Sequence, residues 1–169
     1  ENILRAFEMV SGLRMNHAYV RPGGLAQDIP LGLTDFVRSV MPNIKNDIGE
    51  LEALLMENPI LKSRFVGVGE ISLSAAMAMG LTGPCVRAAG YPLDMRKIKP
   101  YCGYETYDFD VPVYDRSDCY TRLAVRFDEC YQSLKIVSQC ADRLDEITER
   151  GEDPSNTTMV ACLLYTSPS

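Results

Sequence analysis

The chain has 169 residues, of which 46% are hydrophobic and 24% charged, with a net charge of −6 and a pI near 4.8. This length suffices for one hydrophobic core and makes a second domain unexpected. The composition excludes disorder as a description of the whole chain. The acidic balance disfavours nucleic acid as a partner, and no apolar run reaches the about 18 residues that a membrane-spanning helix needs. A start without Met, inside a helical pattern, suggests a fragment of a longer protein.

Helical spacing of apolar residues predicts a first helix over residues 1–10, which Gly12 can end. From Leu13 to Gly32 the periodicity disappears while proline and glycine accumulate. We interpret this stretch as a long ordered loop, and loops of that length in compact domains are usually functional or disordered.

A second helix is predicted to begin with Thr34 as its N-cap and to stop at Asn58-Pro59. Pro42 interrupts the pattern, and because proline has no backbone N–H we expect a kink or a break there. The apolar stripe of this helix consists of Val37, Val40, Ile44, Ile48, Leu51 and Leu55.

Small residues from Ser72 to Met79 predict a short helix that is buried on more than one side. The stretch from Tyr91 to Asp115 is too irregular for a helix. The last helix has a heptad-type seam, formed by Tyr120, Leu123, Phe127, Cys130, Leu134, Val137, Ala141 and Leu144. We expect it to pack in a helical bundle, and a coiled coil with a partner chain is the alternative.

The six cysteines stand at positions 85, 102, 119, 130, 140 and 162, and none forms a C-x-x-C pair. An in-chain zinc or iron–sulfur site therefore has little support. Because nothing points to secretion, we expect reduced and mostly structural thiols.

His17, the only histidine, lies in the loop sequence M-N-H-A-Y-V-R-P-G-G together with Tyr19 and Arg21. Histidine can change its charge near neutral pH, and arginine carries a fixed positive charge. Such a loop can hold an anionic cofactor or cluster at close range, although a lone histidine is more often structural.

Two other segments invite a functional interpretation. Gly67-Val68-Gly69 lacks the third glycine of a dinucleotide motif, because Ser72 stands there, and no βαβ pattern surrounds it, so we reject nucleotide binding. A cluster of carboxylates among tyrosines is compatible with metal binding, with acid–base chemistry or with a protein interface, and we favour the interface. These carboxylates are Asp108, Asp110, Asp115 and Asp118.

Six blocks follow one another along the chain: HAYVRPGG with DIP, VGVGEIS, GLTGPCVRAAG, PYCGYETYDFDVPV, SDCYTRLAVRFDE and QSLKIVSQC. In this order they resemble the family of the quinone-site, D-type subunit of NADH:quinone oxidoreductase (respiratory complex I), from about Glu1 to Ile147. The resemblance implies a mainly α fold with small β elements, a partial copy of the nickel–iron-hydrogenase large subunit. We expect residues 1–154 to form this domain and residues 155–169 to be a non-native or disordered tail, because the ending departs from the family pattern.

The resemblance further implies a fragment of a proton-translocating, multisubunit oxidoreductase that is inactive by itself. It would line the region between a 4Fe-4S cluster held by a partner subunit and the quinone site, with NADH and FMN elsewhere in the complex and no cofactor on its own residues. The implied partners are the cluster-bearing small subunit, other peripheral-arm subunits, the membrane arm and quinone, without nucleic acid. The implied location is peripheral, on the cytoplasmic face of the bacterial inner membrane or the matrix face of the mitochondrial one.

Carried over residue by residue, the resemblance implies that His17 and Arg21 lie close to the partner's cluster. Many relatives have the histidine one place earlier, where this chain has Asn16. No catalytic residue and no metal ligand is assigned, since the family's quinone ligands lie upstream of this region. The alternatives are a large-subunit relative in a membrane-bound hydrogenase or a coenzyme-F420-type dehydrogenase, and a purely structural scaffold.

Overall fold

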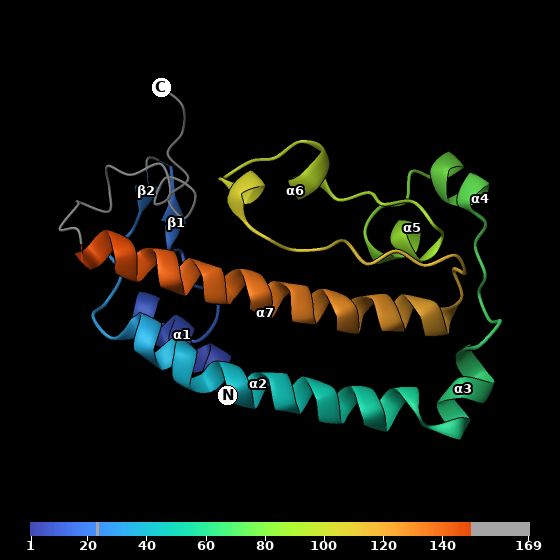
Figure 1. Cartoon of the computed structure of the whole chain (residues 1–169), viewed down its shortest axis with the longest axis horizontal. Coiled ribbons are helices and arrows are strands. Elements are labelled where there is room, and N and C mark those ends of the chain that lie inside the picture. The colour runs from blue at the N-terminus through green and yellow to red at the C-terminus, as the bar shows by residue number, and fades with distance from the viewer. Residues whose placement is uncertain (23, 150–169) are drawn as a thin grey trace. The chain divides into compact units, whose positions relative to one another are not determined.

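The computed structural model describes residues 1–22 and 24–149, so the tail expected at residues 155–169 lies outside the described part of the chain. The described elements are mainly helices with one small sheet, as the sequence predicts (Figure 1). The helices are α1 (Asn2–Ser11), α2 (Leu33–Met56), α3 (Pro59–Phe65), α4 (Leu73–Ala78), α5 (Pro84–Ala88), α6 (Met95–Ile98) and α7 (Cys119–Glu149), with a 3-10 turn at Tyr104–Thr106. The strands are β1 (Val20–Arg21) and β2 (Gly24–Leu25). None of the helices described for this chain is long and apolar enough to cross a membrane.

The described residues divide into two compact units, and α2 and α7 each contribute residues to both. The first unit consists of Glu1–Pro42, Pro100–Tyr107 and the described residues from Val137 onward, and the second of Asn43–Lys99 and Asp108–Ile136. Buried apolar residues of the first unit are Val40, Ala141 and Ile147. Those of the second are Ala76, Val86, Ala88, Phe109, Val125, Phe127 and Ile136.

Helix α2 differs from its prediction at its start and at its proline. It begins at Leu33, so Thr34 lies inside the first turn instead of capping it. It also continues through Pro42 without the break that was one of the two expectations. Proline removes only the hydrogen bond to the carbonyl of Arg38, and the intact turns on either side keep the helix continuous.

The predicted stop at Asn58-Pro59 is confirmed, and it also starts the next helix. The side chain of Asn58 accepts hydrogen bonds from the backbone N–H groups of Ile60 at 2.8 Å and Leu61 at 3.3 Å. Pro59 occupies the first turn of α3, where its missing N–H has no consequence.

Helix α7 is buried along a row that the predicted seam does not include. Thr121, Val125 and Ile136 are buried, whereas the seam residue Val137 is 42% exposed and Cys130 is also exposed. The heptad seam therefore describes only part of the surface that α7 buries. Elements pack on more than one side of this helix, and that widens the buried surface beyond a single stripe.

Helix α4 was expected to be buried on more than one side, and this prediction is wrong. Ala76 is fully buried, but Met77 and Met79 are exposed. Small side chains allow a close approach of a neighbour without requiring one on every side.

The cysteines at positions 85, 102, 119, 130 and 140 are free thiols, and Cys162 lies outside the described residues.

Candidate functional site

The loop of residues 12–32, which contains both predicted site residues, is tied to α1 at each end. Arg14 forms an ion pair with the carboxylate of Glu1, at the start of α1. The side-chain amide of Gln27 donates a hydrogen bond to the carbonyl of Val10, near the end of α1. The predicted site residues lie between these two anchors, so the loop is held as a unit against the helix.

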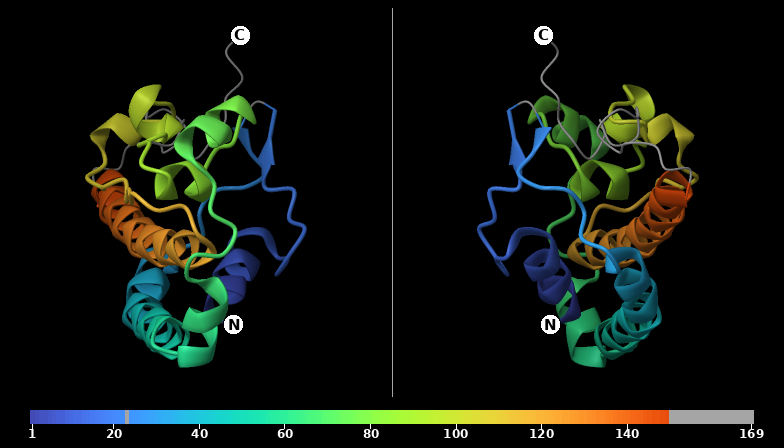
Figure 2. Two further views of the ribbon diagram at one scale, coloured as in Figure 1. Left: turned by 90° about the vertical axis from the view of Figure 1, so that its right-hand side faces the viewer. Right: turned by 90° about the vertical axis from the view of Figure 1, so that its left-hand side faces the viewer.

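A short hairpin forms the centre of this loop (Figure 2). β1 and β2 pair antiparallel with Arg21 opposite Gly24, and the N–H of Ala26 donates to the carbonyl of Tyr19 at 2.8 Å. Gly24 has a φ of 145°, which a residue with a side chain rarely adopts. The hairpin thus requires glycine at position 24, while position 23 is not described.

His17 is exposed and contacts an aromatic ring of α1. Its ring centroid lies 4.9 Å from that of Phe7, with an angle of 37° between the planes. The preceding residue, Asn16, has a left-handed φ of 56°, a conformation that asparagine tolerates better than most residues. No residue in the described part of the chain hydrogen-bonds the imidazole, so the contact with Phe7 is what positions it.

Arg21 is also exposed, and it is positioned by its own loop. Its Nε donates a hydrogen bond to the carbonyl of Ala18 at 2.9 Å. Among the described residues no carboxylate pairs with this guanidinium, so its charge lies on the loop surface without a neutralising partner there. His17 and Arg21 lie on one loop, four positions apart, and no contact between them is found within the described residues.

Tyr19 lies between these two residues and was not identified from the sequence as a structural element. Its hydroxyl is buried and has no hydrogen-bond partner in the described structure. Burial, together with the negative charge of Asp28, raises the pKa of the Tyr19 hydroxyl. An unsatisfied buried hydroxyl costs about 1–3 kcal/mol, so the Tyr19 oxygen does not stabilise the hairpin.

A second polar segment, the turn at residues 67–72, docks against the start of α7. The carboxylate of Asp118 accepts hydrogen bonds from the N–H of Gly67 and the N–H of Thr121, both at 2.8 Å. Burial alone would raise the pKa of the Asp118 carboxyl, but these two hydrogen bonds and the charge of Arg116 outweigh it and keep the pKa below its ordinary value. Asp118 therefore joins the turn to the helix as an anion.

The glycines of this turn serve its close packing. Gly67 and Gly69 have φ angles of 70° and 64°. A Cβ at Gly69 would lie 3.2 Å from Nη2 of Arg122, whose Nη1 donates to the Gly69 carbonyl at 3.0 Å. The N–H of Cys119 donates to the carbonyl of Val68 at 3.0 Å. These bonds close the turn onto α7.

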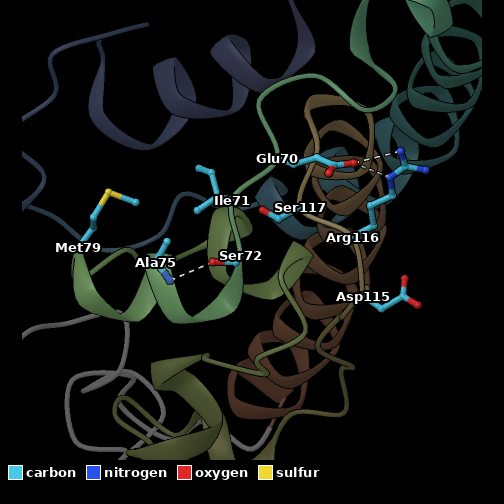
Figure 3. Close-up of a pocket in the computed structure, with 8 residues that line it drawn as sticks. All are labelled: Glu70, Ile71, Ser72, Ala75, Met79, Asp115, Arg116 and Ser117. Atoms are coloured by element: carbon cyan, nitrogen blue, oxygen red, sulfur yellow. Dashed lines mark hydrogen bonds and ion pairs between the residues drawn. The ribbon is translucent and has the colours of Figure 1, made fainter.

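An open pocket of about 620 Å³ borders the same turn (Figure 3). Its lining residues are Glu70, Ile71, Ser72, Ala75, Met79, Asp115, Arg116 and Ser117. In Figure 3 the apolar side chains lie toward α4, and Glu70 and Arg116, whose ion pair measures 3.1 Å, lie on the opposite side. The Ser72 hydroxyl caps α4 by accepting from Ala75, and the Ser117 hydroxyl donates to the carbonyl of Cys85. The hydroxyls are thus engaged, and the pocket offers a binding surface without an activated nucleophile.

The acidic segment does not gather its carboxylates around a common point. Asp118 binds backbone N–H groups, and Asp108 pairs with Lys135 at 2.7 Å. Across the described residues no group of three His, Cys, Asp or Glu side chains lies close enough to hold a metal ion. The interface interpretation of this segment stays a prediction.

A partly buried ion pair in the second unit was not predicted from the sequence. Nε of Arg87 donates to Oε1 of Glu129 at 2.6 Å, and its Nη1 donates to the carbonyl of Leu93 at 2.7 Å. The Arg87 carbonyl accepts from the N–H of Tyr114 at 3.0 Å. This arrangement joins α5 and two irregular segments to α7, and no sequence signal could have identified it because its partners are far apart in the chain.

Comparison with known proteins gives a consistent result over most of the chain. The family model described as "Respiratory-chain NADH dehydrogenase, 49 Kd subunit" matches residues 1–163. A D-type subunit of NADH-quinone oxidoreductase from Streptomyces avermitilis is 54% identical over 144 residues, 85% of this chain and 32% of that protein. The D-type subunits of Acidothermus cellulolyticus and Mycolicibacterium smegmatis are 54% and 52% identical, each over 85% of this chain and 33% of the relative. The chain thus spans about a third of the length of the curated relatives it matches.

Proposed function

This chain belongs to the family of the 49 Kd subunit of respiratory-chain NADH dehydrogenase, and on that basis we propose that it forms part of an NADH:quinone oxidoreductase. The observation that carries the proposal is the 54% identity to a D-type subunit of that enzyme over 85% of the chain. In this proposal the chain is one segment of a subunit in a proton-translocating enzyme, and it has no activity by itself.

The fold we propose is a partial copy of the hydrogenase large subunit, built on the long helices α2 and α7. The mainly helical composition supports it. We propose residues 1–154 as this domain, with residues 155–169 as a tail that is not native to it.

The loop of residues 12–32 is the part of this chain that we propose to face a 4Fe-4S cluster held by a partner subunit. Its support is local: His17 and Arg21 are both exposed on one loop that is anchored to α1 at both ends. The described residues do not fit the role of cluster ligands, because no three potential ligands lie together. We therefore assign no cofactor to this chain's own side chains, and we propose quinone and the cluster as neighbours and NADH and FMN as more distant components.

The chemistry that this loop can supply is electrostatic. Histidine is the residue type whose charge can change near neutral pH, and in this proposal His17 places such a side chain beside a cluster that gains negative charge. The guanidinium of Arg21 supplies a fixed positive charge that favours an anionic neighbour. Neither residue needs to form a covalent bond in this role, and neither is proposed as a catalytic residue.

The proposed partners are the cluster-bearing small subunit, other subunits of the peripheral arm and the membrane arm. The proposed location is peripheral, on the cytoplasmic face of a bacterial inner membrane or the matrix face of a mitochondrial one. The similarity to bacterial subunits of NADH-quinone oxidoreductase supports the oxidoreductase assembly itself.

The experiment uses His17→Ala in the full-length subunit within the assembled enzyme. Redox titration of the neighbouring cluster at several pH values should give a flatter dependence of the midpoint potential on pH than in the unchanged enzyme. Gln27→Ala is the control, because it removes an anchor of the loop without removing a titratable group. An unchanged slope in His17→Ala would overturn the role proposed for His17.

A structural scaffold is the second candidate, and the buried polar contacts of Asp118 and Arg87 favour it. In that case the double variant His17→Ala, Arg21→Ala would assemble and keep its full quinone reductase activity. The remaining alternative, a hydrogenase or F420-type dehydrogenase relative, would be recognised by C-x-x-C pairs near the ends of the full-length protein.

A further inference from the structure

The part of α2 in the second unit packs on α7 through one face. A Cβ at Gly49 would lie 3.7 Å from the hydroxyl oxygen of Tyr131, and that hydroxyl donates to Oε2 of Glu52 at 2.7 Å. The hydroxyl of Tyr120 donates to the carbonyl of Met56 at 3.1 Å. Figure 1 shows the second half of α2 running beside the first half of α7. The spacing of these α2 residues by three and four positions places them on one side of the helix.

The opposite face of the same helix is uncovered. Asp47, Glu50 and Leu54 each stand two positions before a residue that packs on α7, which places them about 200° further around the helix. The side chain of Leu54 is 67% exposed, and that of Leu51 is 48% exposed although it belongs to the predicted apolar stripe. Glu57 extends this face, because its N–H still donates to the carbonyl of Ala53 at 3.1 Å, as in a helix.

The charges on this face have one sign. Asp47 and Glu50 are three positions apart, an arrangement that sets two negative charges side by side on a helix. Within the described part of the chain, no ion pair joins either of them or Glu57 to a cation. The face therefore combines two exposed leucines with three carboxylates for which the described residues provide no cation. A partner that covers this face would bury the leucines, and its cationic side chains would neutralise the carboxylates.

We propose that the face formed by Asp47, Glu50, Leu51, Leu54 and Glu57, here called the acidic face, is the docking surface for a helix of the assembled oxidoreductase that lies outside these 169 residues. That helix places aliphatic side chains on the two leucines and lysine or arginine side chains against the carboxylates. An anionic lipid surface fits poorly, since the acidic face would repel it. The inference rests on the proposed function, because it requires an assembled oxidoreductase.

The first experiment measures the exposure of Leu54. The variant Leu54→Cys is made both in the 169-residue chain and in the full-length subunit. Maleimide labelling at position 54 is then followed by peptide mass mapping, in the isolated 169-residue chain and in the enzyme assembled with the full-length subunit. The labelling rate should fall about tenfold or more on assembly, since the centre of an interface excludes water. Lys45→Cys is the matched control: it is exposed on the same helix but lies toward the other side, and its labelling rate should not fall.

The second experiment tests the charge of the covering helix. Glu50→Lys should lower the yield of assembled enzyme several-fold, whereas Glu146→Lys, a reversal at an exposed carboxylate outside both the acidic face and the segment of residues 108–118, should not. Carbodiimide treatment of the unchanged enzyme should join Glu50 or Glu57 to a lysine outside this chain.

Several results would overturn the inference. One is that position 54 labels equally fast in the assembled enzyme, and another is that positions 45 and 54 are protected equally. Slower labelling of the isolated chain at higher concentration would mean that a second copy covers the face, and protection by vesicles of anionic phospholipid would mean that lipid does. If the full-length subunit without substitutions fails to assemble, the proposed function itself fails, and this outcome is distinct from assembly with a reactive Cys at position 54.

Discussion

The loop at residues 12–32 and the turn at residues 67–72 are both polar and rich in glycine, yet they are held in different ways. The turn is closed onto α7 by the buried carboxylate of Asp118 and by Arg122. The loop is anchored to α1 at its ends and by the contact of the His17 ring with Phe7, and it leaves His17 and Arg21 exposed. The difference teaches that polar side chains hold a fold when they are buried with partners, and remain available for binding when they are exposed without them.

Replacing Asp118 should have the largest effect, because it breaks the closed turn directly. Asp118→Ala leaves the N–H groups of Gly67 and Thr121 without their acceptor, and we expect a loss of about 3 kcal/mol in the free energy of unfolding. Urea unfolding followed by circular dichroism measures it. Asp115→Ala, at an exposed carboxylate three positions away, should stay within about 0.5 kcal/mol. Equal losses in the two variants would contradict the role of Asp118.

The same carboxylate should make the stability depend on pH. Because the pKa of Asp118 is lower in the folded chain than its value of about 3.9 in the unfolded chain, its anion stabilises the fold fully above that value. This contribution is lost as the pH falls through the folded pKa. The difference in unfolding free energy between the unchanged chain and Asp118→Asn should therefore be largest at neutral pH and shrink in acid. A difference that stays constant down to acidic pH would refute this linkage, and Asp115→Asn serves as the control.

Replacing one glycine of the turn and one of the loop by alanine tests how crowded the backbone is in each segment. Gly69 and Gly12 have similar left-handed φ angles of 64° and 75°, so both substitutions carry a backbone cost of about 1 kcal/mol. Nothing lies within 4 Å of a Cβ at Gly12, whereas at Gly69 it meets Arg122 at 3.2 Å. We expect Gly69→Ala to lose about 2 kcal/mol in total and Gly12→Ala about half of that. Equal losses in urea unfolding would mean that Arg122 moves aside freely.

The smallest effect is expected inside the loop, at Tyr19. Tyr19→Phe removes a buried hydroxyl that has no partner in the described structure, so the free energy of unfolding should stay the same or rise by up to about 1 kcal/mol. Tyr131→Phe is the comparison, since its hydroxyl donates to Glu52 at 2.7 Å and its loss should be destabilising. If Tyr19→Phe destabilises the chain as much as Tyr131→Phe does, the Tyr19 hydroxyl has a partner after all.

Four helices, α1, α2, α4 and α7, could be predicted because their signals are local, whereas α6 lies in the stretch from Tyr91 to Asp115 and shows that the expectation of no helix there was wrong. Gly12 ends α1 in a left-handed conformation, Asn58 caps α3 and Ser72 caps α4, and each acts on residues within one turn of itself. The start of α2 was missed, and of the two expectations at Pro42 the break was wrong, because both features depend on the stability of the whole helix. The surface that α7 buries was only partly predicted, since a single seam cannot represent a helix with neighbours on several sides.

The candidate site was predictable to a smaller extent. The loop around His17 and Arg21 could be selected from the sequence as unusual. The buried hydroxyl of Tyr19 could not be anticipated, since burial of one atom depends on how the hairpin folds back. The pocket beside α4 also has no sequence signature, because its lining residues come from two separate segments.

The amino-acid sequence alone is sufficient to predict the mainly helical class, the ends of several helices and the membership of the family. Helix caps, apolar spacing and ordered sequence blocks are properties of neighbouring residues, so they can be recognised without the folded structure. The docking of the turn onto α7 required the folded chain: Asp118 and Gly67 are 51 positions apart. The exposure of the acidic face required it as well, since the sequence places Leu51 in an apolar stripe and only the packing of α2 on α7 reveals which side remains uncovered. Contacts between distant segments choose the buried side of each helix, and a local pattern cannot encode that choice.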